Sequence, residues 1–136
     1  LGPARFNGYI DFVSVHDTYV RIRDYKSGKQ KVTYAEIPTN LQLGIYALYI
    51  KRLFPDKEVV AELYYLRDGQ ARGHRFTDDD LLNVETKLLN IVTGILNKES
   101  FVATSNERAC NWCDYAKNGV CPTGRLRLDR RGPSKY

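Results

Sequence analysis

Residues 19–28, YVRIRDYKSG, decide the fold of this chain. A run of β-branched and aromatic residues ends here in a Ser-Gly turn signal, which predicts a strand that closes at a turn. Because side chains alternate along a strand, Asp24 and Lys26 project to the same face. An Asp-x-Lys pair usually lies on the solvated face of a sheet, so other residues must converge on it before it indicates a site.

A second strand is predicted just upstream, over residues 6–15, with a polar hairpin loop at 16–18. It carries Asp11 inside an apolar run, where a carboxylate is costly unless it is paired or binds a metal. If the strands pair, Asp11, Asp24 and Lys26 meet at one spot, and this set suits a hard divalent cation with an activated water. Alternatively, Asp11 forms a structural salt bridge, for example with Lys26.

The rest of the chain predicts a helix, two strands and a second helix around one sheet. Residues 29–38 are polar, and we expect an irregular, mobile loop there. The predicted elements that follow are a helix over 39–54, a strand over 59–66, a return strand ending at 76, and a helix over 77–97. The order β-β-α-β-β-α, followed by a cysteine segment, predicts a mixed α/β or α+β fold.

Length and composition limit the classes of protein that this chain can represent. The 136 residues fit one domain, and no apolar run approaches the roughly 18 residues of a membrane helix. No leader directs export, so we expect a cytoplasmic protein. The absence of methionine, and a start just before a strand, favour a fragment of a longer protein.

The net charge of +5 is concentrated at the C-terminal end. Residues 125–136 carry +4, which leaves about +1 for the rest of the chain. Such a basic tail is typical of an electrostatic arm for phosphate, and equally of a solvated, disordered terminus. The charge alone is weak support for nucleic-acid binding.

Three cysteines, Cys110, Cys113 and Cys121, fall within a dozen residues. An odd, clustered set differs from the disulfide framework of a secreted domain and favours a metal-binding turn in a reducing compartment. Three thiolates are one short of a closed zinc or [4Fe–4S] site. The alternative is three free or core thiols.

Three motifs follow one another along the chain: Gly8-x-x-Asp11, Asp24-x-Lys26-Ser27-Gly28 and Gln42-x-x-x-Tyr46. In this order they resemble the nuclease domain of the RecB and AddB exonucleases and of Cas4-type CRISPR-associated nucleases, within the PD-(D/E)xK superfamily. The resemblance covers roughly residues 6–122. It implies a restriction-endonuclease-like mixed sheet flanked by helices, with a C-terminal cysteine-rich lobe. The implied parts are a nuclease core over 1–104 that lacks its N-terminal helix, an iron–sulfur segment over 105–124 and a basic tail over 125–136.

The resemblance also implies roles for the acidic cluster. Asp11 and Asp24 would ligate Mg²⁺ or Mn²⁺, and the backbone carbonyl of Tyr25 would be a further ligand. Lys26 would orient or activate the attacking water. Because two neighbouring carboxylates favour the ammonium form of a lysine, we expect positioning and charge stabilisation from Lys26 rather than general-base catalysis.

Gln42 and Tyr46 lie four residues apart, hence on one face of the predicted helix. The resemblance implies that both residues lie at the rim of the active site and contact substrate or water. Each has an alternative role. Gln42 also completes a capping-box pattern with Thr39, and Tyr46 also suits a core aromatic position.

Two of the departures from the family pattern concern ligands, one of the cluster and one of the metal. In the resembling family a distant cysteine, ahead of the nuclease core, completes the [4Fe–4S] cluster, but no cysteine precedes Cys110 here. The fourth ligand would therefore lie outside this chain, and Zn²⁺ remains an alternative. The family also has a metal-binding histidine ahead of Gly-x-x-Asp, whereas His16 and His74 follow that motif and are expected on the surface.

The resemblance implies a metal-dependent deoxyribonuclease, exonucleolytic on single strands or duplex ends. Its setting would be DNA repair and recombination or CRISPR adaptation, with helicase or CRISPR-associated subunits as partners. Two other classes of function stay open. One is a non-catalytic DNA-binding module with an incomplete metal site, and the other is a metal-stabilised interaction domain.

Overall fold

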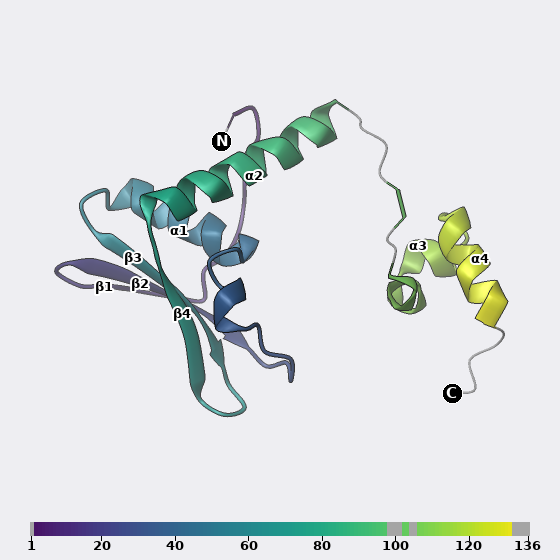
Figure 1. Ribbon diagram of the computed structural model, residues 1–136, viewed down its shortest axis with the longest axis horizontal. Helices are drawn as coiled ribbons and strands as arrows, with labels where there is room; N and C mark the ends of the chain where they lie inside the picture. Colours follow the sequence, from purple (N-terminus) through teal and green to yellow (C-terminus); the bar gives the residue numbers. More distant parts are fainter. Residues whose placement is uncertain (1, 98–101, 104–105, 132–136) are drawn as a thin grey trace. The chain divides into compact units, whose positions relative to one another are not determined.

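The computed structural model of the chain describes residues 2–97, 102–103 and 106–131 (Figure 1). The chain divides into two compact units, Leu1–Asn97 and Lys98–Tyr136. The first unit holds the sheet and the second holds the cysteines. No helix among the described residues combines the length and apolar character that a bilayer crossing requires.

The first unit is built on a four-stranded sheet in the order β1-β2-β3-β4. The strands are β1 (Phe12–Val15), β2 (Tyr19–Lys26), β3 (Glu58–Tyr65) and β4 (Gln70–Phe76). Two antiparallel hairpins, β1–β2 and β3–β4, meet along a parallel pairing of β2 with β3. The parallel pairing needs a crossover, which α1 (Leu41–Leu53) supplies. The predicted mixed sheet with flanking helices is confirmed.

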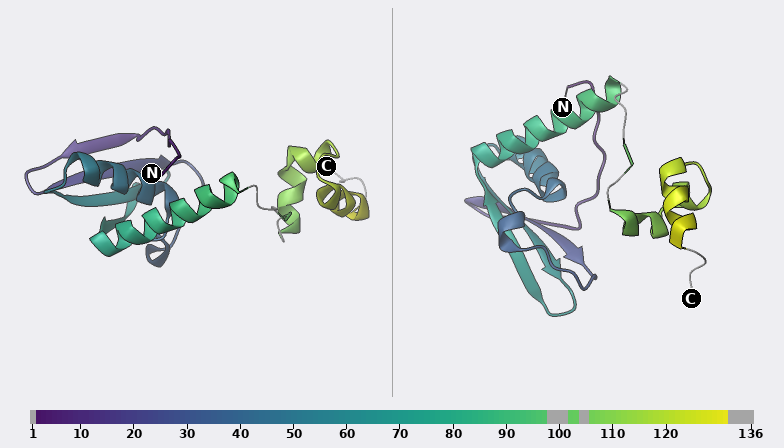
Figure 2. Two further views of the ribbon diagram at one scale, coloured as in Figure 1. Left: turned by 90° about the horizontal axis from the view of Figure 1, so that it is seen from above. Right: turned by 45° about the vertical axis from the view of Figure 1, so that its right-hand side comes forward.

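The hydrophobic core lies on one face of this sheet. α1 and α2 (Asp78–Leu96) both pack on that face, as the views in Figure 1 and Figure 2 show. The strands contribute alternate residues to the core: Val20 and Ile22 from β2, and Val59, Ala61, Leu63 and Tyr65 from β3. At Gly44 of α1, an added Cβ would lie 2.6 Å from Val84 of α2, so the close helix pairing requires a glycine there.

The N-cap of α1 lies one residue after the predicted Thr39. Asn40 is the N-cap, and its side chain accepts a hydrogen bond from the backbone N–H of Leu43 at 3.1 Å. Thr39 instead donates its hydroxyl hydrogen to the carbonyl of Glu36. The predicted capping box of Thr39 with Gln42 is therefore wrong, and the Gln42 side chain is available for other contacts.

The segment between β2 and α1 is more ordered than the irregular loop that was expected. It contains the 3₁₀ helix η1 (Tyr34–Glu36), whose capping box joins Thr33 to Glu36. Ile37 is completely buried in the core. Long-range contacts therefore fold a stretch whose local sequence is polar.

The second unit is helical, with η2 (Glu107–Trp112), α3 (Asp114–Lys117) and α4 (Pro122–Arg131). Residues 125–131, which the sequence suggests as the start of a basic tail, belong to α4. Arg125 pairs with Asp129 one turn later, at 3.1 Å. The rest of the predicted tail, residues 132–136, lies outside the described residues.

Candidate active site

Asp24 and Lys26 are the last two residues on the core face of β2. The buried positions of this strand alternate, and Asp24 continues the row that Val20 and Ile22 begin. The side chain of Asp24 is 6% exposed, whereas that of Lys26 is 37% exposed. The expectation that the two side chains share a face holds, but this face is the buried one, so the solvated-face alternative is wrong.

The ion pair between these two residues leaves Asp24 incompletely satisfied. Lys26 Nζ lies 2.7 Å from Asp24 Oδ2, yet the direction of approach does not make a hydrogen bond, and this buried oxygen has none from any described residue. An ion pair offsets the charge of a buried carboxylate, but its lone pairs still need directed donors or a cation. Asp24 therefore retains the capacity to bind a cation.

A line of hydrogen bonds runs from Lys26 through α1 to the N-terminal segment. Lys26 Nζ donates to Gln42 Oε1 at 3.0 Å, and Gln42 Nε2 donates to the hydroxyl oxygen of Tyr46 at 3.1 Å. The Tyr46 hydroxyl donates in turn to the carbonyl of Tyr9 at 2.7 Å. Tyr46 also packs against the core, so its aromatic ring and its hydroxyl have separate roles.

Asp11 lies in a different environment from the one expected. β1 begins at Phe12, so the predicted strand over 6–15 is too long, and Asp11 sits at an exposed bend just before it. The expectation of a buried Asp11 is wrong. Its Oδ2 accepts a hydrogen bond from the backbone N–H of Tyr25 at 2.9 Å, whereas Lys26 pairs with Asp24. The hydrogen bond from the Tyr25 backbone therefore holds the Asp11 carboxylate near the end of β2.

A second ion pair, which the sequence analysis missed, lies on the opposite face of the sheet. Arg23 Nε donates to Glu62 Oε1 at 2.6 Å, across the parallel pairing of β2 with β3. The hydrogen bond to Glu62 raises the pKa of Arg23. Glu62 is the acid inside the apolar run that follows Glu58 in β3, the same signal that drew attention to Asp11. Its partner becomes evident only from the order of the strands.

The two histidines take no part in this cluster. His16 is exposed and stacks on Tyr19, with ring centroids 4.3 Å apart. His74 is half-buried, and its Nε2 lies 2.7 Å from Asp80 Oδ2 at the start of α2. The expectation of a surface position holds for His16 and is wrong for His74.

Comparison with known families gives this cluster a context. The family model for the PD-(D/E)XK nuclease superfamily matches residues 2–122. The chain belongs to this superfamily. No curated protein and no solved structure matches the chain. Superfamily members are typically metal-dependent nucleases that use Mg²⁺ or Mn²⁺, and the fold implies DNA as the substrate.

The oxygen donors of the cluster fit the kind of metal that the superfamily uses. Asp11 and Asp24 offer carboxylate oxygens, and the backbone of Tyr25 lies beside them. Among the described residues, no group of three or more His, Cys, Asp or Glu side chains could hold a metal ion. Mg²⁺ characteristically takes one or two carboxylates and completes its shell with water and substrate phosphate. Asp24 at the end of β2 and Asp11, which accepts from the Tyr25 backbone there, match that number of protein carboxylates.

The three cysteines lie in the second unit as free thiols. Cys110 is buried, whereas Cys113 and Cys121 are half-buried. Two groups of α4 reach the sulfurs: the backbone N–H of Gly124 donates to Cys121 Sγ at 3.3 Å, and Arg127 Nη1 lies 3.9 Å from Cys110 Sγ. Over the described ranges, the cysteines do not form a group that could hold a metal. The iron–sulfur cluster and its zinc alternative therefore remain predictions from the sequence.

Proposed function

We propose that this chain hydrolyses DNA phosphodiester bonds at the cluster of Asp11, Asp24 and Lys26, with Mg²⁺ or Mn²⁺. The observation that carries the proposal is the buried Asp24 oxygen without a directed hydrogen bond. The ion pair with Lys26 offsets the charge of this carboxylate, but it leaves the acceptor capacity of the buried oxygen for a cation. Cation binding needs a carboxylate, which accounts for the buried Asp24 at the end of β2.

In the proposed reaction Asp11, Asp24 and the Tyr25 carbonyl hold the cation. When bound, the cation would lower the pKa of a water molecule and offset charge on the phosphoryl oxygens. Asp24 and Gln42 hold the ammonium group of Lys26 in position. A fixed cation stabilises the negative charge that develops on the phosphoryl group, because it needs little reorganisation during the reaction.

Gln42 and Tyr46 would act as positioning residues. Gln42 accepts from Lys26 and donates to Tyr46, so its amide has a defined orientation. Tyr46 links that amide to the Tyr9 carbonyl, two residues before Asp11. The arrangement supports a role in holding the Lys26 ammonium group and the Asp11 carboxylate in position relative to each other.

The finer functional assignments rest on the order of the three sequence motifs. We propose exonucleolytic action on single strands or duplex ends, in DNA repair and recombination or CRISPR adaptation, with helicase or CRISPR-associated subunits as partners. The spacing of Cys110, Cys113 and Cys121 supports a structural [4Fe–4S] cluster with its fourth ligand outside this chain. Iron and zinc analysis of the full-length protein, with visible absorbance, would distinguish iron–sulfur from zinc.

The experiment that tests the hydrolytic proposal compares matched variants on labelled linear DNA. Wild type, Asp24→Ala and Lys26→Ala are assayed with Mn²⁺, Mg²⁺ or EDTA. The controls are Asp17→Ala and Lys87→Ala, which remove the same groups from exposed positions outside the cluster. We expect metal-dependent degradation by wild type and both controls, and its loss in both cluster variants. Equal activity in all five proteins overturns the proposal. DNA binding without cleavage by wild type supports a non-catalytic binding module instead.

A further inference from the structure

Lys26 has two acceptors, which belong to different elements of the fold. Its Nζ lies 2.7 Å from Asp24 Oδ2 on the same strand and donates to Gln42 Oε1 of α1 at 3.0 Å. The contact with Asp24 is an ion pair without hydrogen-bond geometry, so the directed bond of the ammonium group goes to Gln42. Loss of the ion pair would therefore leave the hydrogen bond to Gln42 in place.

The ammonium group lies where it opposes a second cation on Asp24. Mg²⁺ approaches a carboxylate oxygen to about 2.0–2.1 Å, which is closer than Nζ lies to Oδ2. The two oxygens of a carboxylate are neighbours, so a divalent cation on either one would lie close to Nζ. The Asp24 side chain is only 6% exposed, and little water is present to screen the repulsion between the two cations. Metal binding at Asp24 and the ion pair with Lys26 therefore oppose each other.

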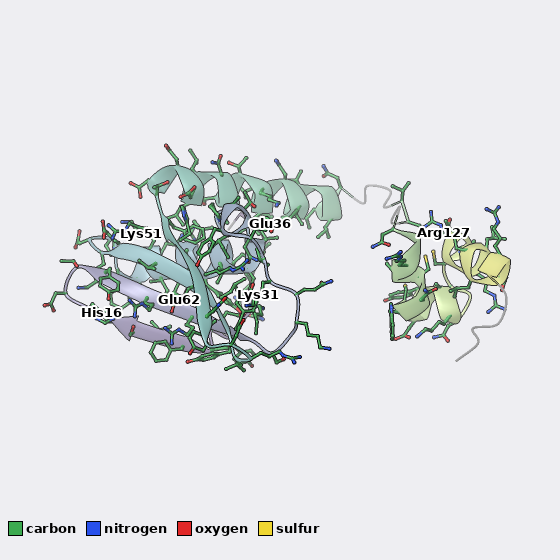
Figure 3. The ribbon with its side chains drawn as sticks, turned by 60° about the horizontal axis from the view of Figure 1, so that its bottom comes forward. His16, Lys31, Glu36, Lys51, Glu62 and Arg127 are labelled. Atoms are coloured by element: carbon green, nitrogen blue, oxygen red, sulfur yellow. The ribbon has the colours of Figure 1, made fainter. Side chains whose placement is uncertain are left out.

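A cavity beside Lys26 gives its side chain room to move away from Asp24. The cavity has a volume of about 370 Å³, and the Lys26 side chain, 37% exposed, lines it. Its wall includes the segment between β2 and α1, which carries Lys31 and Glu36 (Figure 3). Both of these charges have partners in the fold. The ammonium group can therefore turn toward the cavity without meeting an unpaired charge among the residues that line it.

Gln42 is oriented so that it can hold the ammonium group without Asp24. Its Nε2 donates to the Tyr46 hydroxyl oxygen at 3.1 Å, which directs its Oε1 to Lys26. The Tyr46 hydroxyl is fixed in turn by the Tyr9 carbonyl at 2.7 Å. An acceptor that is already oriented needs little further ordering when the ion pair is lost.

We propose that Lys26 is the counter-ion of Asp24 that a divalent cation must displace, and that Gln42 then holds the ammonium group. The inference rests on the proposed hydrolytic function and deepens it, since it makes the metal affinity of the site depend on Lys26. The buried carboxylate is then paired either with Lys26 or with the cation, which avoids the cost of an unpaired buried charge. Lys26 thus weakens metal binding and supports hydrolysis, two effects of opposite sign at one residue.

Metal affinity in the absence of DNA provides the first test. Isothermal titration calorimetry with Mn²⁺ compares wild type, Asp24→Asn and Lys26→Met, with Lys87→Met as a control that removes an exposed lysine of α2. We expect binding to be lost in Asp24→Asn and unchanged in Lys87→Met. In Lys26→Met we expect the affinity to rise about 5- to 20-fold, toward the lower end of typical couplings because Lys26 is partly exposed.

Gln42 provides the second test, because its effect on metal affinity should depend on Lys26. In Gln42→Ala the ammonium group loses its directed acceptor and turns fully to Asp24, so we expect Mn²⁺ affinity to fall about two- to fivefold. The double variant Lys26→Met/Gln42→Ala should bind Mn²⁺ as tightly as Lys26→Met alone. An equal loss on removal of Gln42 in both backgrounds would show a merely structural role and overturn its part in the exchange.

The wild-type protein provides a test that does not depend on the folding of Lys26→Met, in which Asp24 loses its counter-ion. The ¹³Cε and ¹⁵Nζ signals of Lys26 are followed by NMR during titration with Mg²⁺. We expect both signals to shift and to reach a plateau as the metal saturates Asp24. Unchanged Lys26 signals at saturating Mg²⁺ overturn the displacement.

The outcomes separate this inference from the hydrolytic proposal. If Lys26→Met binds Mn²⁺ no more tightly than wild type, while wild type cleaves linear DNA, the displacement alone is overturned. If Lys26→Met binds Mn²⁺ more tightly but wild type does not cleave, the hydrolytic proposal falls and the displacement stands. Mn²⁺ binding that does not depend on Asp24 overturns both.

Discussion

Arg23 and Asp24 are neighbours on β2, yet they form ion pairs of opposite character. Arg23 pairs across the sheet with Glu62 through a directed hydrogen bond of 2.6 Å, and its guanidinium lies 4.5 Å from the ring centroid of Tyr64. Asp24 pairs with Lys26 on its own strand at 2.7 Å, and the buried carboxylate oxygen receives no directed hydrogen bond. Strand alternation places the two pairs on opposite faces of the sheet.

The difference between the two pairs separates stability from function. In the Arg23–Glu62 pair the charges offset each other and a directed hydrogen bond joins Nε to Oε1. In the Asp24–Lys26 pair the charge is offset, but the acceptor capacity of Asp24 remains. A satisfied pair contributes to folding, whereas an incompletely satisfied one at a metal-type cluster is a candidate for ligand binding. Substitutions at the two pairs should therefore act on different measurements.

The largest expected effect follows from Asp24→Asn. The substitution keeps the shape of the side chain and removes the charge that would hold a cation, so we expect Mn²⁺-dependent hydrolysis to fall about 100- to 1,000-fold. Lys26 keeps Gln42 as a partner. The free energy of unfolding should therefore change by less than about 1 kcal/mol, or rise, as is common when a functional charge is removed. Activity assays and urea unfolding of the same preparation measure both effects.

The second-largest effect is expected from Glu62→Gln, which should lower stability and largely preserve activity. A neutral amide is a weaker acceptor for Arg23, whose side chain is only 24% exposed, so we expect the free energy of unfolding to fall by about 1–2 kcal/mol. Activity per folded molecule should stay within about twofold of wild type. Urea unfolding measures the loss, and a double-mutant cycle with Arg23→Ala and Glu62→Ala isolates the pairwise part. A large loss of activity in Glu62→Gln would remove the distinction between the two pairs.

The features of the Asp24–Lys26 site that depend on local pattern can be predicted from the sequence. Alternation alone places Asp24 and Lys26 on one face, and a four-residue spacing does the same for Gln42 and Tyr46. The order of helices and strands follows from apolar periodicity and turn residues. These features depend on neighbours within one element, so a single sequence carries them.

Features that depend on distant contacts could not be predicted in the same way. Thr39 and Asn40 are both good N-caps, but in the fold the Thr39 hydroxyl donates to the Glu36 carbonyl and Asn40 is the cap. Glu62 pairs with a residue 39 positions away, which requires the order of the strands. The apolar run around Asp11 suggested a longer strand than the pairing with β2 supports.

A smaller, pH-dependent effect is expected at Asp80, which pairs with His74. Burial opposes ionisation of Asp80, but hydrogen bonds from His74 and Thr77 outweigh it, and the pKa of Asp80 is lowered from 3.8. A lowered folded-state pKa means that this carboxylate stabilises the fold above about pH 4, and that the contribution is lost as the pH falls through the folded-state value. Asp80→Asn should therefore lower stability by about 1 kcal/mol at pH 7.

Thermal unfolding between pH 2 and pH 7 measures this effect of Asp80. The curves of wild type and Asp80→Asn should be apart at neutral pH and converge at the acid end. Asp79→Asn, in the same first turn of α2, controls for the general interaction with the helix dipole. A constant separation across the whole range would show that ionisation of Asp80 does not contribute to folding.

The smallest expected effect comes from Tyr46→Phe, which tests how α1 supports the Asp24–Lys26 pair. The substitution keeps the ring in the core and removes the hydroxyl that joins Gln42 to the Tyr9 carbonyl. We expect kcat to fall about two- to fivefold with KM for DNA unchanged, because the Tyr46 hydroxyl bonds Gln42 and the Tyr9 carbonyl and so acts by positioning. Tyr49→Phe, an exposed hydroxyl on the same helix, should have no effect. If the loss of kcat in the double variant Gln42→Ala/Tyr46→Phe is little larger than that in Gln42→Ala alone, the two residues act on Lys26 as one unit. The Arg23–Glu62 pair needs no such support, because β2 and β3 are already fixed to each other by the sheet.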